Sequence, residues 1–173
     1  MIDGKLDIAG ARILIVDDQE ANVQLLEQLL VEAGYTCVAT TTNPTEVCAL
    51  HRKNGYDLIL LDLQMPGMDG FAVIAGLKTS KTDSYLPVIV LTAQPGHKLR
   101  ALQAGAKDFI SKPFDLVEVK TRIHNMLEVR LLYRKLEAHA ADARPNRQKA
   151  LSRGWVWQPR RQAERADPGL GCL

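Results

Sequence analysis

Cysteine and long apolar runs are both scarce in this chain of 173 residues. Its three cysteines, Cys37, Cys48 and Cys172, are odd in number and lack metal-ligand spacing, so they support neither a disulfide framework nor a zinc site. No stretch approaches the roughly 18 apolar residues of a membrane span. The opening residues have neither the basic start nor the apolar core of a secretory signal. We therefore expect a cytoplasmic protein with no membrane partner.

The net charge of +2 is small and unevenly distributed. Residues 145–173 carry six Lys or Arg against two acidic residues, and they show neither helical nor strand periodicity. We expect a disordered basic tail there. Trp155 and Trp157 among its arginines could bind nucleic acid through charge and stacking. No helix-turn-helix pattern accompanies the tail, so a DNA-binding regulator is the alternative and nucleic acid is not the expected partner.

Apolar runs of strand length repeatedly end in a polar residue. Leu58 to Leu61 is continuously apolar and precedes Asp62, which is typical of a strand buried on both faces of a parallel sheet. Two further runs, 13–16 and 88–91, repeat the pattern. Five strands alternating with five helices predict an α/β fold, a doubly wound parallel sheet with helices on both faces. The expected strands are 12–16, 35–40, 57–61, 87–91 and 107–111, and the expected helices are 19–33, 43–54, 71–78, 94–104 and 115–143.

The last predicted helix is unusually long, because neither Gly nor Pro interrupts residues 115–143. At 1.5 Å per residue it would extend roughly 43 Å, more than a domain of this size needs to cover its sheet. Its outer apolar residues follow an alternating three- and four-residue spacing: Met126, Val129, Tyr133, Leu136, Ala140 and Ala143. This spacing favours a coiled-coil seam that pairs two copies as a homodimer or carries a signal, with a solvated amphipathic extension as the alternative.

The polar residues that follow the strands are expected to meet, because the carboxyl ends of parallel strands lie at one edge of a sheet. They would bring together three carboxylates, a hydroxyl and an ammonium: Asp17, Asp18, Asp62, Thr92 and Lys112. Three neighbouring carboxylates repel each other unless a cation is held between them. Mg²⁺ prefers oxygen ligands and keeps several waters. The predicted partial shell for Mg²⁺ consists of Asp17, Asp18, Asp62 and the backbone carbonyl of Gln64.

In type, order and spacing, these residues resemble the receiver domain of two-component response regulators. The resemblance covers about Arg12 to Leu127 and implies the strand order 2-1-3-4-5. By this resemblance, Asp62 is the aspartate that is phosphorylated, and Asp17 and Asp18 are the acidic pair that holds magnesium.

The resemblance extends to the switch residues. Lys112 matches the invariant lysine, and its bond to Pro113 matches the family's cis peptide. Thr92 matches the switch hydroxyl and Phe109 the switch aromatic. The implied function is a receiver whose Asp62 accepts a phosphoryl group, in a Mg²⁺-dependent reaction, from a sensor histidine kinase or phosphotransfer protein. It would promote only its own phosphorylation and dephosphorylation, so no enzymatic activity on other substrates is expected.

The predicted organisation is a receiver domain at 1–128, an extension of the last helix at 129–144, and the basic tail at 145–173. The segment 127–136 is similar to the helix that joins receivers to cyclic-di-GMP enzymes and related effectors. The residues from Pro145 onward are too few and too irregular for such an effector. One hypothesis is therefore a truncated or frame-shifted fragment of a longer regulator.

Two other function classes fit less well. A phosphohydrolase with an aspartyl-phosphate intermediate usually needs a second acid two residues after the nucleophile, where this chain has Gln64. A flavin- or nucleotide-binding module needs a Gly- or Thr-rich phosphate loop after the first strand, and the acidic residues there would repel phosphate. All four histidines fall in helical, polar settings, and none is assigned chemistry.

Overall fold

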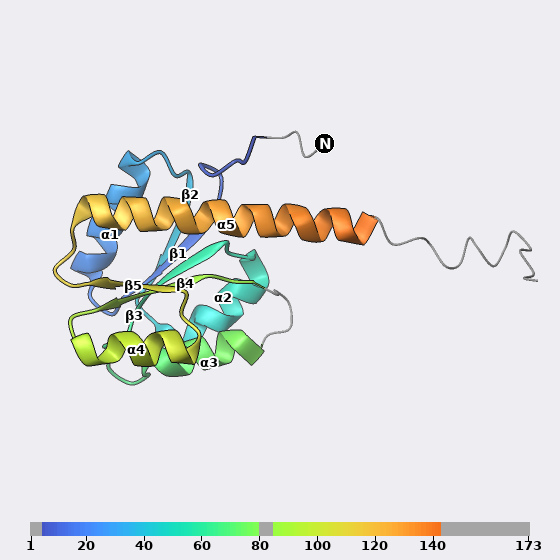
Figure 1. Cartoon of the computed structure of the whole chain (residues 1–173). Coiled ribbons are helices and arrows are strands. Elements are labelled where there is room, and N and C mark those ends of the chain that lie inside the picture. Colours follow the sequence, from blue (N-terminus) through green and yellow to red (C-terminus); the bar gives the residue numbers. More distant parts are fainter. Residues whose placement is uncertain (1–4, 80–84, 143–173) are drawn as a thin grey trace, which may run out of the picture.

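A five-stranded parallel sheet with helices on both faces forms the body of the protein (Figure 1). The computed structural model describes residues 5–79 and 85–142. The strand order β2-β1-β3-β4-β5 confirms the predicted topology. The strands are β1 (Arg12–Val16), β2 (Cys37–Thr41), β3 (Leu58–Asp62), β4 (Val88–Thr92) and β5 (Asp108–Ser111). In the register, Asp62 is opposite Leu91 and Thr92 is opposite Ser111, so the polar strand ends share one edge.

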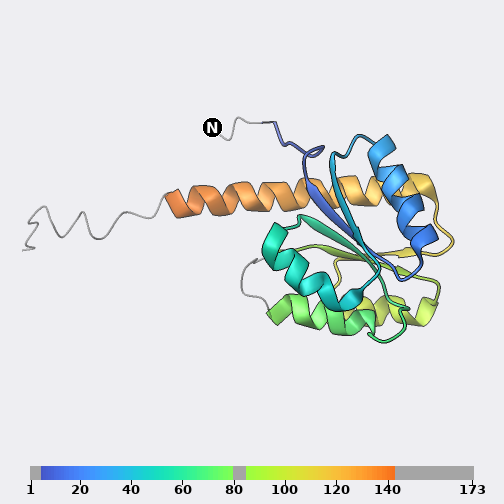
Figure 2. The same cartoon turned by 180° about the vertical axis from the view of Figure 1, so that it is seen from behind.

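The helices divide between the two faces of the sheet (Figures 1 and 2). They are α1 (Glu20–Glu32), α2 (Val47–Asn54), α3 (Gly70–Thr79), α4 (Pro95–Ala104) and α5 (Leu116–Asp142). One buried cluster joins the sheet to α1 and α5, and a second joins it to α2, α3 and α4. Ile13 and Ile15 belong to the first cluster, whereas Leu14 and Val16 belong to the second. Both faces of β1 are therefore apolar, which explains its uninterrupted run of apolar residues.

Three local features differ from the prediction. β2 begins at Cys37, two residues later than expected. The helix expected from Asn43 opens with a 3-10 turn, Pro44–Glu46, in which Asn43 Oδ1 accepts a hydrogen bond from the Thr45 N–H at 3.1 Å. The prediction of a polar setting for His51 is wrong. Its side chain is 3% exposed, and its Nδ1 accepts the Tyr56 backbone N–H at 3.2 Å because the turn after α2 folds back over it.

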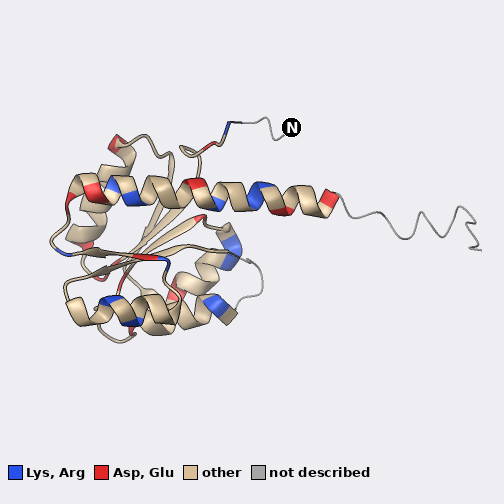
Figure 3. Cartoon of the chain, viewed as in Figure 1, with Lys and Arg blue, Asp and Glu red and all other residues tan. Residues whose placement is uncertain are grey.

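Helix α5 continues well past the sheet, as predicted, although its last expected residue, Ala143, lies outside the described residues (Figure 1). Asp115 caps its start, accepting the backbone N–H groups of Val117 and Glu118 at 2.8 and 3.1 Å. Figure 3 shows both acidic and basic residues along the helix. No helix in the described ranges is long and apolar enough to cross a membrane.

The exposed apolar residues of α5 match the predicted seam in part. Met126 is partly buried and its sulfur contacts Tyr85 Oη at 3.8 Å, while the Tyr133 ring stacks on Tyr85 at 5.0 Å. Of the predicted seam, Val129, Tyr133 and Leu136 are exposed by 46%, 42% and 57%. Leu132, which was not predicted, is exposed by 48% and lies between Val129 and Leu136 at steps of three and four residues.

A buried carboxylate holds α5 at the amino end of β3, and the sequence analysis did not identify it. Asp57 is 2% exposed, and its Oδ1 lies 2.7 Å from Arg134 Nη1 and 3.7 Å from Arg130 Nε. Its Oδ2 accepts the backbone N–H of Arg12 at 3.0 Å. Arg130 is also buried and donates to the Tyr85 carbonyl. Asp57 therefore connects β1, β3 and α5 at the edge opposite Asp62.

Candidate functional site

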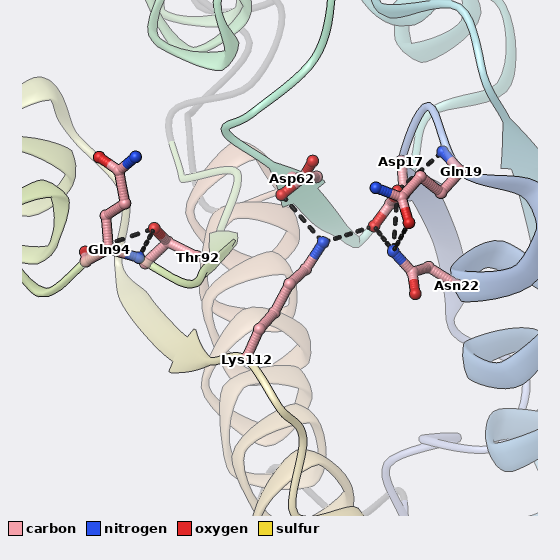
Figure 4. A network of polar contacts seen from close by, with 7 residues as sticks. All are labelled: Asp17, Gln19, Asn22, Asp62, Thr92, Gln94 and Lys112. Atoms are coloured by element: carbon pink, nitrogen blue, oxygen red, sulfur yellow. Dashed lines mark hydrogen bonds and ion pairs between the residues drawn. The ribbon is translucent and has the colours of Figure 1, made fainter.

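The carboxyl edge of the sheet brings the predicted acidic and basic side chains together (Figure 4). Asp17 follows β1 directly, Asp62 is the last residue of β3, and Lys112 follows β5. Lys112 Nζ lies 2.9 Å from Asp17 Oδ2 and 3.1 Å from Asp62 Oδ1. Since Asp17 and Asp62 are 0% and 2% exposed, this ammonium bridges two buried carboxylates. The Lys112–Pro113 peptide is cis, as the family resemblance implied.

The three carboxylates are arranged to fit a divalent cation. Asp17, Asp18 and Asp62 can each offer one oxygen, and these oxygens lie within 4.8 Å of one another. Asp18 Oδ1 is buried and has no hydrogen-bond partner among the described residues, which suits an atom that ligates a metal. An all-oxygen donor set of this kind matches Mg²⁺. Gln64 lies two residues after Asp62 and is exposed. That its backbone carbonyl is a further ligand of Mg²⁺ stays a prediction.

Burial and charge act in opposite directions on Asp62. Burial raises the pKa of Asp62 and the nearby Asp17 carboxylate raises it further, whereas Lys112 and a backbone hydrogen bond from Gln64 lower it. The balance leaves the Asp62 pKa above its ordinary value. For Lys112, burial alone would lower the pKa, but the hydrogen bonds and charges of Asp17 and Asp62 outweigh it and raise the pKa. Lys112 therefore stays cationic at neutral pH.

Asn22 is a contributor to the site that the sequence analysis missed (Figure 4). Its side-chain amide Nδ2 lies 3.2 Å from Asp17 Oδ1 and 3.1 Å from Asp17 Oδ2. The backbone N–H of Gln19 donates to Asp17 Oδ1 at 2.9 Å. The signal available in the sequence was an amide residue in the first turn of the helix that follows the acidic pair.

The two predicted switch residues lie apart from the carboxylate network. Thr92 is 1% exposed, and its hydroxyl interacts with the backbone of Gln94, accepting from the N–H at 3.1 Å and donating to the carbonyl at 3.4 Å. Phe109 is half-buried on β5, with Lys98 Nζ 4.9 Å and the Arg122 guanidinium 6.0 Å from its ring centroid. The structure thus places Thr92 at the shared edge without a hydrogen bond to the carboxylates.

Comparison with known proteins agrees with this geometry. The family model for the response regulator receiver domain matches residues 13–124. The chain is 40% identical over 137 residues to the response regulator PleD of Caulobacter vibrioides, a match that covers 78% of this chain and 30% of that protein. The chain thus spans less than a third of PleD, and about half of the other curated relatives it matches.

Two solved structures extend the likeness to the fold. The receiver domain of the sensor histidine kinase PA1611 from Pseudomonas aeruginosa PAO1, solved with a magnesium ion in its active-site cleft, is 29% identical with a TM-score of 0.64. The match covers 69% of this chain and 99% of that one. The receiver domain of a histidine kinase from Syntrophus aciditrophicus is 34% identical with a TM-score of 0.63, covering 69% of this chain and 91% of that one.

Proposed function

Because the chain belongs to the response regulator receiver family, we propose that it is a phosphoryl-accepting switch of a two-component system. Asp62 accepts the phosphoryl group from the phosphohistidine of a sensor histidine kinase or phosphotransfer protein. One observation carries the proposal: buried Asp62 lies 3.1 Å from Lys112 Nζ, and its carboxylate forms a cluster with two others. A nucleophile, a cation and a metal-binding carboxylate pair are the parts that phosphoryl transfer needs.

The proposed transfer uses groups already adjacent in the structure. A carboxylate oxygen of Asp62 forms a bond to phosphorus while the bond from phosphorus to the donor histidine nitrogen breaks, and the electron pair stays on that nitrogen. Lys112 Nζ offsets negative charge on the phosphoryl oxygens. Asp17, Asp18 and Asp62 would hold Mg²⁺, which would supply further charge neutralisation. The protein promotes reactions of its own Asp62 alone, so we propose no enzymatic activity on other substrates.

Thr92 and Phe109 are proposed to convert phosphorylation into a change of surface. The Thr92 hydroxyl leaves its contacts with the Gln94 backbone and donates to a phosphoryl oxygen. This movement makes room for the Phe109 ring to rotate inward, away from Lys98 and Arg122. Because Lys98 belongs to α4 and Arg122 to α5, the rotation alters the surface that these helices share.

The output surface that we propose is the stripe of Val129, Leu132 and Leu136, and its occupant is the same stripe of a second copy. The residues recur at steps of three and four, which is the seam of a two-stranded coiled coil. They lie on the exposed face of α5, and Arg130 and Arg134 of the same stretch contact Asp57 of the body. The basic tail expected at 145–173 lies outside the described residues, and we propose no nucleic-acid partner for it.

Incubation with acetyl phosphate and Mg²⁺, followed by intact mass measurement, tests the phosphoacceptor. We expect a gain of one phosphoryl group that is absent in Asp62→Asn and without Mg²⁺. Asp69→Asn is the matched control, because Asp69 lies in the loop that follows Asp62 but its side chain is 53% exposed. An unmodified wild-type protein, or a gain that persists in Asp62→Asn, would contradict the proposal.

A further inference from the structure

The Asp17 carboxylate is held by three donors that differ in which of its oxygens they contact (Figure 4). The Gln19 backbone N–H reaches Oδ1 at 2.9 Å, and Lys112 Nζ reaches Oδ2 at 2.9 Å. The Asn22 amide reaches both oxygens, at 3.2 and 3.1 Å. Because it contacts both oxygens, Asn22 is the donor best placed to fix the rotation of the whole carboxylate group.

Lys112 is a shared donor, since the same ammonium also lies 3.1 Å from Asp62. When it offsets charge on a phosphoryl group at Asp62, its contact with Asp17 weakens. Oδ2 of Asp17 then keeps the hydrogen bond from Asn22. The Gln19 N–H cannot replace it, because its hydrogen bond is to the other oxygen.

Asn22 is suited to hold this carboxylate without competing with a cation. It lies in the first turn of α1, where its backbone N–H donates to the Gln19 carbonyl at 3.0 Å, so its side chain starts from a fixed point. Its amide also lies 3.5 Å from Gln19 Oε1. The amide is neutral and leaves the full negative charge of Asp17 for a metal ion, whereas a Lys or Arg at this position would repel the metal.

We propose that Asn22 is a positioning residue that holds the Asp17 carboxylate in the orientation that ligates Mg²⁺; this inference rests on the function proposed above for the same site. Outer hydrogen-bond partners of metal ligands act in this way in metalloproteins, and their loss weakens metal binding. The alternative role is structural, in which the contact between Asn22 and Asp17 only stabilises the start of α1.

The test is a calorimetric titration of the full chain with MgCl₂. For Asn22→Ala and for the near-isosteric Asn22→Leu, we expect the Mg²⁺ dissociation constant to rise about tenfold. Gln28→Ala is the matched control, because Gln28 lies on the same helix and its amide donates to Glu32 at 2.9 Å rather than to Asp17. For this control, we expect a dissociation constant within about twofold of the wild type.

A second measurement separates positioning from a structural role. The Mg²⁺ dependence of phosphorylation by acetyl phosphate should shift to higher Mg²⁺ in Asn22→Ala, while the rate at saturating Mg²⁺ recovers to near the wild-type value. A variant that melts earlier but binds Mg²⁺ as the wild type does would overturn the inference and support the structural role. If the wild type binds Mg²⁺ and Asn22→Ala weakens that binding, but Asp62 is not phosphorylated, the inference stands and the proposed function fails.

Discussion

Replacing Asp57 by alanine should destabilise the protein by about 3 kcal/mol, because it removes the carboxylate of a buried ion pair. The Asp57 carboxylate is 2% exposed and lies 3.7 Å from the Nε of Arg130, which is itself 2% exposed. The change also removes the acceptor of the Arg12 backbone N–H and of Arg134. The contact with Arg134 adds little to the total, because that side chain is 54% exposed and screened by solvent.

Urea unfolding followed by circular dichroism at equilibrium measures this loss directly. With linear extrapolation, we expect Asp57→Ala to be about 3 kcal/mol less stable and Arg134→Ala at most about 1 kcal/mol less stable. Asp69→Asn is the control, since its side chain is half exposed, lies 4.0 Å from Arg100, and keeps an oxygen that can accept the Phe71 N–H. A loss below about 1 kcal/mol for Asp57→Ala would refute the reasoning, because the pair would then behave like one at the surface.

Three further predictions concern the site and the long helix. Gly70→Ala should destabilise the protein by about 1–3 kcal/mol in urea unfolding, because the new Cβ would lie 2.8 Å from the Asp62 carbonyl oxygen and from Leu63 Cα. Gly96→Ala is the control and should not destabilise the protein, because a Cβ at Gly96 would meet no atom of the surrounding structure within 4 Å. In EDTA, the folded protein holds the Asp62 proton more tightly than the unfolded chain does, because the pKa of Asp62 is raised in the folded state. The resulting contribution to the free energy of unfolding should therefore be lost as pH rises through that raised pKa. Asp62→Asn should remove this part of the pH dependence of unfolding, and equal pH profiles for the two proteins would contradict the cause assigned. In analytical ultracentrifugation, the wild type should be a dimer and Leu132→Lys a monomer. Leu99→Lys, at an exposed position on α4, should remain a dimer. A monomeric wild type would contradict the coiled-coil proposal.

The sequence was sufficient to predict the strands, the parallel sheet and the main side chains of the acidic site. Leu58 to Leu61 could be assigned to a buried strand because both faces of that strand are covered, and this leaves a local signature of unbroken apolar residues. Asp17, Asp62 and Lys112 could be placed together because each follows or ends such a strand. The topology of a parallel sheet then sends all three to one edge.

Away from the acidic site, only the structure showed which distant residues meet. Asp57 lies 73 positions before Arg130 and 77 before Arg134, and nothing near any of them in the chain indicates a buried ion pair. The same holds for Tyr85, which contacts Met126 and Tyr133 on α5. The periodicity of apolar residues and the polar residues that follow strands involve positions close together in the chain, so both can be recognised from the sequence. Which side chains of other elements pack against α5 depends on the whole fold, and only the folded arrangement determines that.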